Sequence, residues 1–364
     1  MPDFAQRRDR LRKLMKEQEA DGFLVTDFTN VSYLTGFTGD DSFLLLKDKK
    51  ELLLTDKRYT EQLETECPDL ELVVREPGET MAVKLAELLE ATKVKNLAVE
   101  ADNFTLAQLN DLLEKLSTAA VVGTKGLVLQ LREIKDKDEV DLIREAIRVA
   151  ERAFGVVKAS LRNDLTEKQI GDEIDRQIRL FGGTGCSFTP IVGVGPRAAL
   201  PHGRPGPTKL GDSSFVLIDW GARANGYISD LTRVLVTNKT PAKLLKMYEV
   251  CLAANQAGIA AIRPGAIMQD VDAAARKVIE KAGFGKQFGH SLGHGIGMQV
   301  HEQPRLAIGQ ERPLKAGMVV TVEPGIYIPG FGGVRVEDDV LVTKNGHEVL
   351  TSVPKLLEDC QFQP

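Results

Sequence analysis

Two aspartates in the second half of the sequence are placed so that they could share a cation. A run of apolar residues predicts a buried strand that ends at Asp219, and an Asn-Gly pair at 225–226 is a strong signal for a two-residue hairpin turn. A turn centred there sets Asp219 opposite Thr232, with Asp230 diagonal to Asp219 on the same face of the sheet. Two carboxylates this close at a buried strand end repel each other unless a cation neutralises them. Two surface aspartates on an edge hairpin are the alternative.

A second pair of carboxylates, Glu323 and Glu337, repeats this arrangement. They lie on expected strands joined by the turn-rich sequence IPGFGG, and a loop of about five residues would set them opposite or diagonal to each other on one face. Pro324 makes the first strand irregular, because proline has no N–H to donate to a neighbouring strand. An ordinary surface hairpin is again the alternative for this pair taken alone.

Three histidines lie among glycines in the segment FGHSLGHGIGMQVHEQPR, residues 288–305. The spacing of His290, His294 and His301 could follow one face of a helix, but the four glycines in this segment argue against a stable helix. Glycines beside a histidine let the backbone and a ligand approach closely. A phosphate-binding loop is not indicated, because no strand-to-helix context with a lysine follows. A fourth histidine, His202, lies in LPHGRPG, just before the first aspartate strand. Any one of these histidines alone could be an ordinary packed residue.

Together, the four carboxylates and one of the histidines form a donor set for two divalent cations, which would neutralise their charge. Oxygen-rich ligation with a single imidazole suits Mn²⁺, Co²⁺, Fe²⁺ or Zn²⁺ pairs better than structural zinc, and no cysteine is placed to contribute. Two metals roughly 3.5–4 Å apart can activate a bridging water and hold a carbonyl oxygen. The remaining histidines could then donate hydrogen bonds to a developing oxyanion.

The elements that would position these residues are those of a globular protein. The 364 residues suggest about two domains, and 43% apolar with 27% charged residues is close to a globular average. A net charge of −5 gives no electrostatic case for nucleic acid as the main partner. No apolar stretch approaches the roughly 18 residues of a membrane helix, and the charged N-terminus lacks the apolar core of a signal peptide. Four scattered cysteines predict reduced thiols and a cytoplasmic location.

The pattern of helices and strands predicts a mixed α/β chain in two parts. The first part, residues 1–125, alternates helices with short strands, and its leucines between 106 and 116 predict an amphipathic helix with its leucines on one face. Strands are expected at 22–26, 42–46 and 51–55. A linker is expected at 126–132, and the second part, residues 133–364, opens with two helices before strands, glycines and turns dominate. Thr166 and Gln169 predict a capping box at the start of the second of these helices.

Several motifs resemble one known family, the pita-bread metallopeptidases that include aminopeptidase P, prolidase and methionine aminopeptidase. The matching pieces are DWG with SD eleven residues on, GHGIG, TVEPGIY and VRVEDD. YLTGF at 33–37 and TDKRY at 55–59 resemble the creatinase-type N-terminal domain, which methionine aminopeptidases lack. The resemblance therefore covers the whole chain and implies that fold: a creatinase-type domain followed by a pita-bread domain. The metal ligands that it implies are Asp219, Asp230, His294, Glu323 and Glu337.

Other site residues carry over from the same resemblance. His202 and His301 match histidines that stabilise the tetrahedral intermediate, and Glu323 matches the ligand that also shuttles a proton. The proline-side pocket is matched by His290, Tyr327 and Arg335. Arg305, in HEQPR, resembles an arginine with which prolidases bind the carboxylate of a dipeptide.

The resemblance implies a hydrolase of the Xaa-Pro bond in dipeptides or at the N-terminus of short peptides. Arg305 favours prolidase over aminopeptidase P. Two divalent metal ions are expected, Mn²⁺ before Co²⁺, Zn²⁺ or Fe²⁺. The expected partners are short proline-containing peptides and further copies of the chain in a homodimer or larger assembly, with no nucleic acid and no membrane. A methionine-type metalloaminopeptidase and a non-catalytic peptide-binding module on the same fold remain alternatives.

Overall fold

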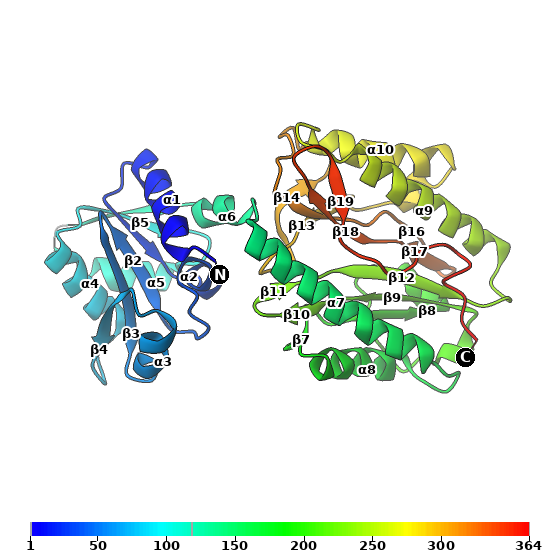
Figure 1. Ribbon diagram of the computed structural model, residues 1–364, viewed down its shortest axis with the longest axis horizontal. Helices are drawn as coiled ribbons and strands as arrows, with labels where there is room; N and C mark the ends of the chain where they lie inside the picture. The colour runs from blue at the N-terminus through cyan, green and yellow to red at the C-terminus, as the bar shows by residue number, and fades with distance from the viewer. Residues whose placement is uncertain (1, 118, 364) are drawn as a thin grey trace. The chain divides into compact units, whose positions relative to one another are not determined.

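The computed structural model describes residues 2–117 and 119–363 and divides into two compact units, Met1–Arg132 and Glu133–Pro364 (Figure 1). Both units mix helices with sheets, as the sequence predicts. Residues 127–132, expected as a linker, form helix α6 (Leu127–Arg132) and belong to the first unit. Among the described residues, none of the helices is both long enough and apolar enough to cross a membrane.

The first unit is built on a six-stranded sheet with the order β4-β3-β2-β1-β5-β6. Its strands are β1 (Gly22–Val25), β2 (Phe43–Lys47), β3 (Lys50–Asp56), β4 (Glu71–Arg75), β5 (Asn96–Glu100) and β6 (Ala120–Thr124). Its other helices are α1 (Phe4–Glu17), α2 (Phe28–Thr35), α3 (Thr60–Glu66), α4 (Met81–Thr92) and α5 (Leu106–Leu113). The strands predicted near 22–26, 42–46 and 51–55 are confirmed as β1, β2 and β3.

The leucine face predicted for residues 106–116 is only partly buried. Within α5, Leu112 is inaccessible to solvent, whereas Leu106 is 72% and Leu113 48% exposed. The spacing of leucines predicts which side of a helix is apolar, but not how much of that side a neighbouring element covers. The predicted helix is confirmed, and its apolar side is covered only in part.

The second unit has four long helices, namely α7 (Lys137–Ala159), α8 (Glu167–Leu180), α9 (Ala242–Ala261) and α10 (Met268–Lys281). Its first strands are β7 (Gly185–Cys186), β8 (Ile191–Val194), β9 (Phe215–Trp220), β10 (Ala222–Ala224), β11 (Tyr227–Ile228) and β12 (Leu231–Val236). The later strands are β13 (Gly293–Gly295), β14 (Glu302–Leu306), β15 (Val319–Val322), β16 (Gly325–Ile328), β17 (Gly332–Arg335), β18 (Asp338–Val342) and β19 (His347–Val349). Figure 1 shows these strands between the helix pairs α7–α8 and α9–α10. The capping box predicted at the start of α8 is confirmed.

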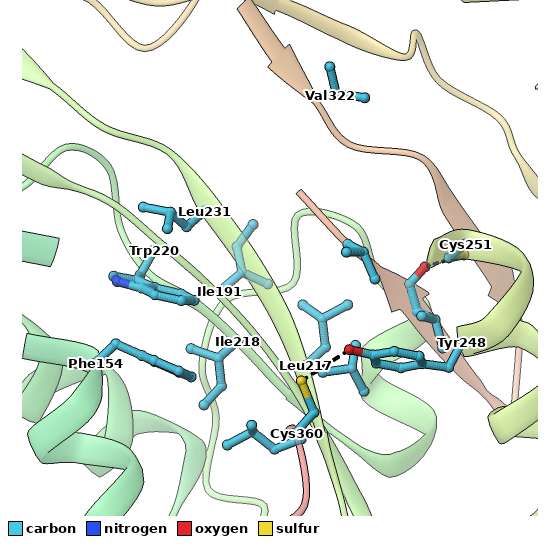
Figure 2. Packing of buried hydrophobic residues seen from close by; sticks show 14 of the residues in the cluster. Phe154, Ile191, Leu217, Ile218, Trp220, Leu231, Tyr248, Cys251, Val322 and Cys360 are labelled. Atoms are coloured by element: carbon cyan, nitrogen blue, oxygen red, sulfur yellow. Dashed lines mark hydrogen bonds between the residues drawn. The ribbon is translucent and has the colours of Figure 1, made fainter. Parts of the chain in front are cut away.

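A buried aromatic pair fixes the end of strand β9. Trp220 stacks on Phe154 of α7 with ring centroids 4.1 Å apart (Figure 2), and its indole N–H donates to the carbonyl oxygen of Ala150 at 3.0 Å. Successive strand residues point to opposite faces of a sheet. Since Trp220 packs toward α7, Asp219 is directed to the other face of β9.

Two antiparallel strand pairs carry the acidic residues. In β9 and β12, Asp219 lies opposite Thr232, which confirms the register predicted from the Asn-Gly turn. β15 and β18 pair up to Val322 opposite Asp338, while β16 and β17 pair Gly325 with Arg335. The pairing of β16 with β17 continues the register of β15 with β18. Glu323 and Glu337, which lie between these two pairings, are therefore opposite each other.

The glycine-rich histidine segment does not form a helix, as predicted; it contains the strands β13 and β14. A Cβ atom at Gly293 would lie 1.9 Å from the carbonyl oxygen of Thr321, and one at Gly295 would lie 2.2 Å from that of Gln303. Only glycine fits at such backbone contacts. The two glycines therefore let β13 pass close to its neighbours and hold His294 between them.

Candidate metal centre

Three carboxylates from two strand pairs converge in the second unit. Asp219, Asp230 and Glu337 each offer an oxygen atom, and these oxygens all lie within 4.8 Å of one another. The three residues are 6%, 5% and 1% exposed. Because like charges at this range and burial repel strongly, the group needs either protons or cations.

An imidazole and a fourth carboxylate complete the cluster. The Nε2 atom of His294 lies 3.4 Å from Glu323 Oε1 and 3.8 Å from Asp230 Oδ2. The other ring nitrogen, Nδ1, lies 3.1 Å from the carbonyl oxygen of Gly295. We assign the proton to Nδ1, which donates to this carbonyl, so that the lone pair of Nε2 faces the carboxylates. Burial and the neighbouring His301 lower the pKa of His294 to about 3, so the ring is neutral at pH 7 and can bind a metal.

The pKa values of all four carboxyl groups are raised, which indicates that the described residues provide too little positive charge to neutralise them. Burial raises the pKa of Asp219, and burial with the neighbouring carboxylates raises those of Asp230 and Glu337 well above their usual range. Burial raises the pKa of Glu323 to about 7. Each shift means that the surroundings disfavour the charged form, and divalent cations would reverse that preference.

One hydroxyl and one guanidinium orient two of these carboxylates. Thr232 Oγ1 donates to Glu337 Oε2 at 2.5 Å and accepts from Arg335 Nε at 3.0 Å. The Nη2 atom of Arg335 donates to Asp219 Oδ2. The second oxygen of Asp219, Oδ1, is buried and has no hydrogen-bond partner within residues 2–117 and 119–363. A buried acceptor left open among other carboxylates is what a bound cation would satisfy, so the residues fit a metal site.

The three residues predicted for the proline-side pocket are linked to one another. The hydroxyl of Tyr327 accepts from Arg335 Nη1 at 2.7 Å and lies 3.1 Å from His290 Nε2. His290 Nδ1 lies 2.8 Å from the carbonyl oxygen of Ser291. Burial lowers the pKa of His290 to about 4, so the ring is neutral at pH 7. Arg335, which also bonds Asp219, therefore links this tyrosine and neutral histidine to the acidic cluster.

The remaining predicted residues are more exposed. The His301 ring lies 4.4 Å from the His294 ring, centroid to centroid, and Arg305 lies directly opposite His294 in the pairing of β13 with β14. Among the described residues, no carboxylate pairs with the guanidinium of Arg305. His202 follows Pro201, whose carbonyl oxygen lies 3.5 Å from Arg335 Nη1. The structure thus sets all three near the five candidate ligands.

Two supporting residues escaped the sequence analysis. Thr232 was predicted opposite Asp219, but its hydroxyl bridge to Glu337 was not. Asp339 is buried, and its Oδ2 accepts the backbone N–H of Asp230 at 3.1 Å. A signal for Asp339 exists in the sequence, because residues two apart in a strand share a face and Glu337 lies two positions before it.

Fold and site together define a class of protein: a two-domain α/β protein whose second unit holds a buried, carboxylate-rich candidate metal centre. Residues 141–344 match the model of metallopeptidase family M24, and residues 7–134 match the Creatinase/Prolidase N-terminal domain. The chain belongs to metallopeptidase family M24. Members of this family bind two divalent metal ions, and the buried acidic cluster lies in the matched region.

Known proteins are similar over nearly the whole chain. An uncharacterized peptidase, YqhT of Bacillus subtilis, is 37% identical over 96% of this chain and 98% of its own length. The structure of an Xaa-Pro dipeptidase from Bacillus anthracis is 36% identical with a TM-score of 0.94, covering 98% of this chain and 99% of that one. An X-Pro aminopeptidase from Thermotoga maritima is 32% identical with a TM-score of 0.89, covering 97% and 99%. These findings confirm the predicted fold and family.

Proposed function

We propose that this chain hydrolyses the Xaa-Pro bond of dipeptides and, less readily, that at the N-terminus of short peptides. The observation that carries the proposal is the buried cluster of four carboxylates and one neutral imidazole, with an open guanidinium at Arg305 beside it. Similar structures include both an Xaa-Pro dipeptidase and an X-Pro aminopeptidase, so the substrate length rests on Arg305.

The proposed ligands of two divalent ions are Asp219, Asp230, His294, Glu323 and Glu337. We favour Mn²⁺, because carboxylate oxygens outnumber the single nitrogen donor, with Co²⁺, Zn²⁺ and Fe²⁺ as other ions that suit this set. When bound, the ions would supply an activated water and a polarised carbonyl group.

The chain's own residues would handle the proton and the developing charge. Glu323 lies in the candidate metal cluster, 3.4 Å from His294 Nε2, and its carboxyl would take a proton from the attacking water and give it to the departing proline nitrogen. His202 and His301 would donate hydrogen bonds to the oxyanion that forms on the carbonyl of the residue before proline.

The pocket wall suits a proline ring. Proline has no N–H to be satisfied and presents an apolar ring. The neutral ring of His290 and the buried Tyr327, which Arg335 holds in place, offer a surface that needs no hydrogen bond from the substrate. We therefore propose these three residues as the proline-side pocket.

Arg305 is the proposed clamp for the carboxylate of a dipeptide. His301 and Arg305 lie on the exposed side of β14 and the turn before it, while Glu302, Pro304 and Leu306 are buried. A guanidinium can hold a carboxylate through two parallel hydrogen bonds. In a dipeptide that carboxylate belongs to the proline itself, whereas in a tripeptide it lies one residue further away.

An assay on metal-loaded protein tests this function. Xaa-Pro should be cleaved faster than Xaa-Pro-Yaa, chelation should abolish both activities, and Mn²⁺ or Co²⁺ should restore them. Cleavage of Met-Yaa peptides without proline would favour a methionine-type aminopeptidase, against which the N-terminal domain argues. Binding of proline peptides without any cleavage would favour a non-catalytic module, against which the complete donor set argues.

We further propose a homodimer or larger assembly and a cytoplasmic location, with residues 133–364 as the catalytic domain after a creatinase-type domain at 1–125. The similarity to two-domain peptidases supports the division into two domains. Gel filtration with light scattering tests the assembly, and a monomer at micromolar concentration would contradict it.

A further inference from the structure

The strand pairing that carries Glu323 and Glu337 is interrupted where these two residues lie. β15 and β18 pair up to Val322 opposite Asp338, and pairing resumes in the same register from Gly325 onward. Among the described residues, the two glutamates themselves form no ladder pair. The backbone that directs both carboxylates therefore depends on support from outside the ladder.

Asn255, on helix α9, supplies such support. Its Nδ2 atom donates to the carbonyl oxygen of Val322 at 2.9 Å and to that of Val336 at 3.3 Å. Each carbonyl belongs to the peptide group that leads directly into Glu323 or Glu337. One fully buried amide therefore bridges the two peptide groups that precede the glutamates.

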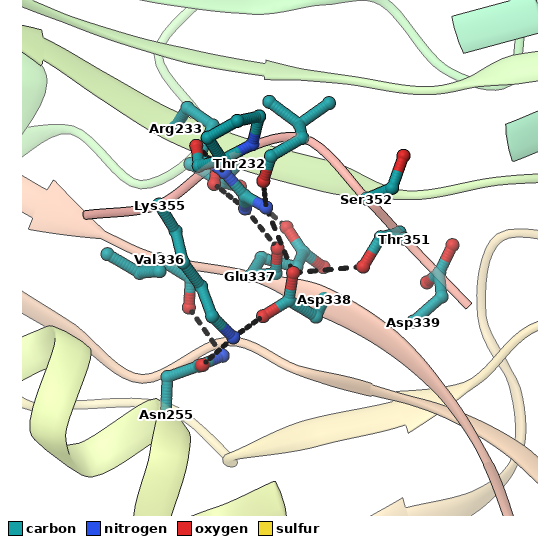
Figure 3. A network of polar contacts seen from close by, with 12 residues as sticks. Thr232, Arg233, Asn255, Val336, Glu337, Asp338, Asp339, Thr351, Ser352 and Lys355 are labelled. Carbon is teal, nitrogen blue, oxygen red and sulfur yellow. Dashed lines mark hydrogen bonds and ion pairs between the residues drawn. The ribbon is translucent and has the colours of Figure 1, made fainter. Parts of the chain in front are cut away.

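Lys355 fixes the orientation of this amide. Its Nζ atom donates to Asn255 Oδ1 at 2.8 Å and pairs with Asp338 Oδ2 at 2.5 Å (Figure 3). A flipped amide would bring its NH₂ group against the ammonium and its oxygen against two carbonyl oxygens. The cation thus holds the donor side of the amide toward the strands.

The same network reaches Glu337 from a second direction. Arg233 Nη1 donates to the carbonyl oxygen of Glu337 at 2.5 Å, and its Nη2 donates to Asp338 Oδ1 at 2.9 Å (Figure 3). The side chains of Arg233 and Asp338 are 1% and 2% exposed. The peptide groups on both sides of Glu337 are therefore held by buried polar side chains.

We propose that Asn255 is a positioning residue of the metal centre, whose amide sets the separation of Glu323 and Glu337 and thereby the affinity for metal ions. This inference rests on the proposed metal site. A residue that only stabilised α9 against the sheet would change the melting temperature but leave metal affinity alone, so the two roles are separable.

The test replaces Asn255 with aspartate, which keeps the size and the contact with Lys355 but loses the NH₂ donor. Mn²⁺ binding to the metal-stripped full chain is followed by calorimetry, and the visible absorption of the Co²⁺-loaded chain reports ligand geometry. We expect Asn255→Asp to bind Mn²⁺ about 10–100-fold more weakly than the wild type, the usual effect of losing a group that orients metal ligands. The Co²⁺ spectrum should change as well.

Tyr248→Phe is the matched control on the same helix. The Tyr248 hydroxyl also bonds the C-terminal segment, at the carbonyl oxygen of Lys355 and the Sγ of Cys360, but among the described residues it makes no hydrogen bond to Asn255 or to the peptide groups that precede Glu323 and Glu337. This variant should lower the melting temperature and keep the wild-type Mn²⁺ affinity and Co²⁺ spectrum. An equal loss of affinity in Tyr248→Phe would overturn the proposal.

Lys355→Met keeps the inference testable if Asn255→Asp does not fold. It leaves the amide in place and removes the cation that orients it, so we expect a smaller loss of Mn²⁺ affinity, of roughly tenfold or less. If the folded variants bind Mn²⁺ with wild-type affinity, the positioning role of Asn255 is refuted, while the proposed function is unaffected. A wild-type chain that binds no Mn²⁺ or Co²⁺ would overturn the proposed function together with it.

Discussion

Replacing Thr232 with valine removes one hydroxyl from the metal centre without changing the size of the side chain. That hydroxyl makes two hydrogen bonds to charged groups, donating to Glu337 Oε2 at 2.5 Å and accepting from Arg335 Nε at 3.0 Å. Thr232 itself is fully buried, so water cannot replace the lost hydroxyl. Both partners would remain in the site with one bond fewer.

The expected magnitude follows from these contacts. Leaving Arg335 Nε unpaired in a buried position should lower the free energy of unfolding by about 1–3 kcal/mol. Loss of the donor to Glu337 frees a proposed metal ligand to rotate, which should weaken metal binding by about 10–100-fold. The two effects have separate readouts, namely denaturant unfolding of the metal-free chain and calorimetric titration with Mn²⁺.

Thr240→Val is the matched control. The Thr240 hydroxyl donates to the carbonyl oxygen of Ser214 at 2.7 Å and accepts from the N–H of Thr237, with no contact to a proposed ligand. We expect a loss of stability of about 1 kcal/mol and unchanged metal affinity. If Thr232→Val folds and binds Mn²⁺ as tightly as the wild type, the orienting role of this hydroxyl is refuted.

Three further predictions concern the substrate, the oxyanion and pH. Arg305→Ala should raise KM for Xaa-Pro about ten- to a hundredfold, the loss of a hydrogen bond to a charged group, and leave Xaa-Pro-Yaa nearly unchanged; equal small effects on both substrates would favour an aminopeptidase. His202→Ala should lower kcat by about 10²–10³-fold while metal content by elemental analysis stays at the wild-type value, and metal loss would show that His202 is a ligand. In the metal-free chain, the pKa of Glu323 is about 7 against an ordinary 4.5, so the folded state holds protons that the unfolded state releases. Thermal stability without metal should therefore fall as pH rises from 4.5 to 7, and saturating Mn²⁺ should remove this fall; a metal-free stability that rises over this window would contradict the shift.

Much of the acidic site follows from local sequence rules. The Asn-Gly turn fixes how β9 and β12 pair, because a two-residue hairpin leaves no freedom of register. This rule alone placed Asp219 opposite Thr232, as the structure has it. The irregularity expected at Pro324 also appears, as the break in pairing between Val322 and Gly325.

Contacts between elements distant in the sequence could not be predicted in this way. Asn255 is one polar residue on a mostly apolar helix, and nothing local indicates that its amide meets two strand carbonyls more than sixty residues away. Likewise, the leucines of α5 show an apolar side but not what covers it. The spacing of apolar residues predicts which side of a helix or strand is apolar. Which other element packs against that side depends on the tertiary fold.

The aromatic stack at the end of β9 gives the molecule a built-in optical reporter. The sequence has a single tryptophan, and Trp220 follows the proposed ligand Asp219 directly while its ring packs on Phe154. All indole fluorescence therefore comes from one buried position next to the acidic cluster, with no background from elsewhere. Titration with Co²⁺, which absorbs in the visible and quenches nearby fluorophores, should thus be readable as a change in intrinsic emission without any label.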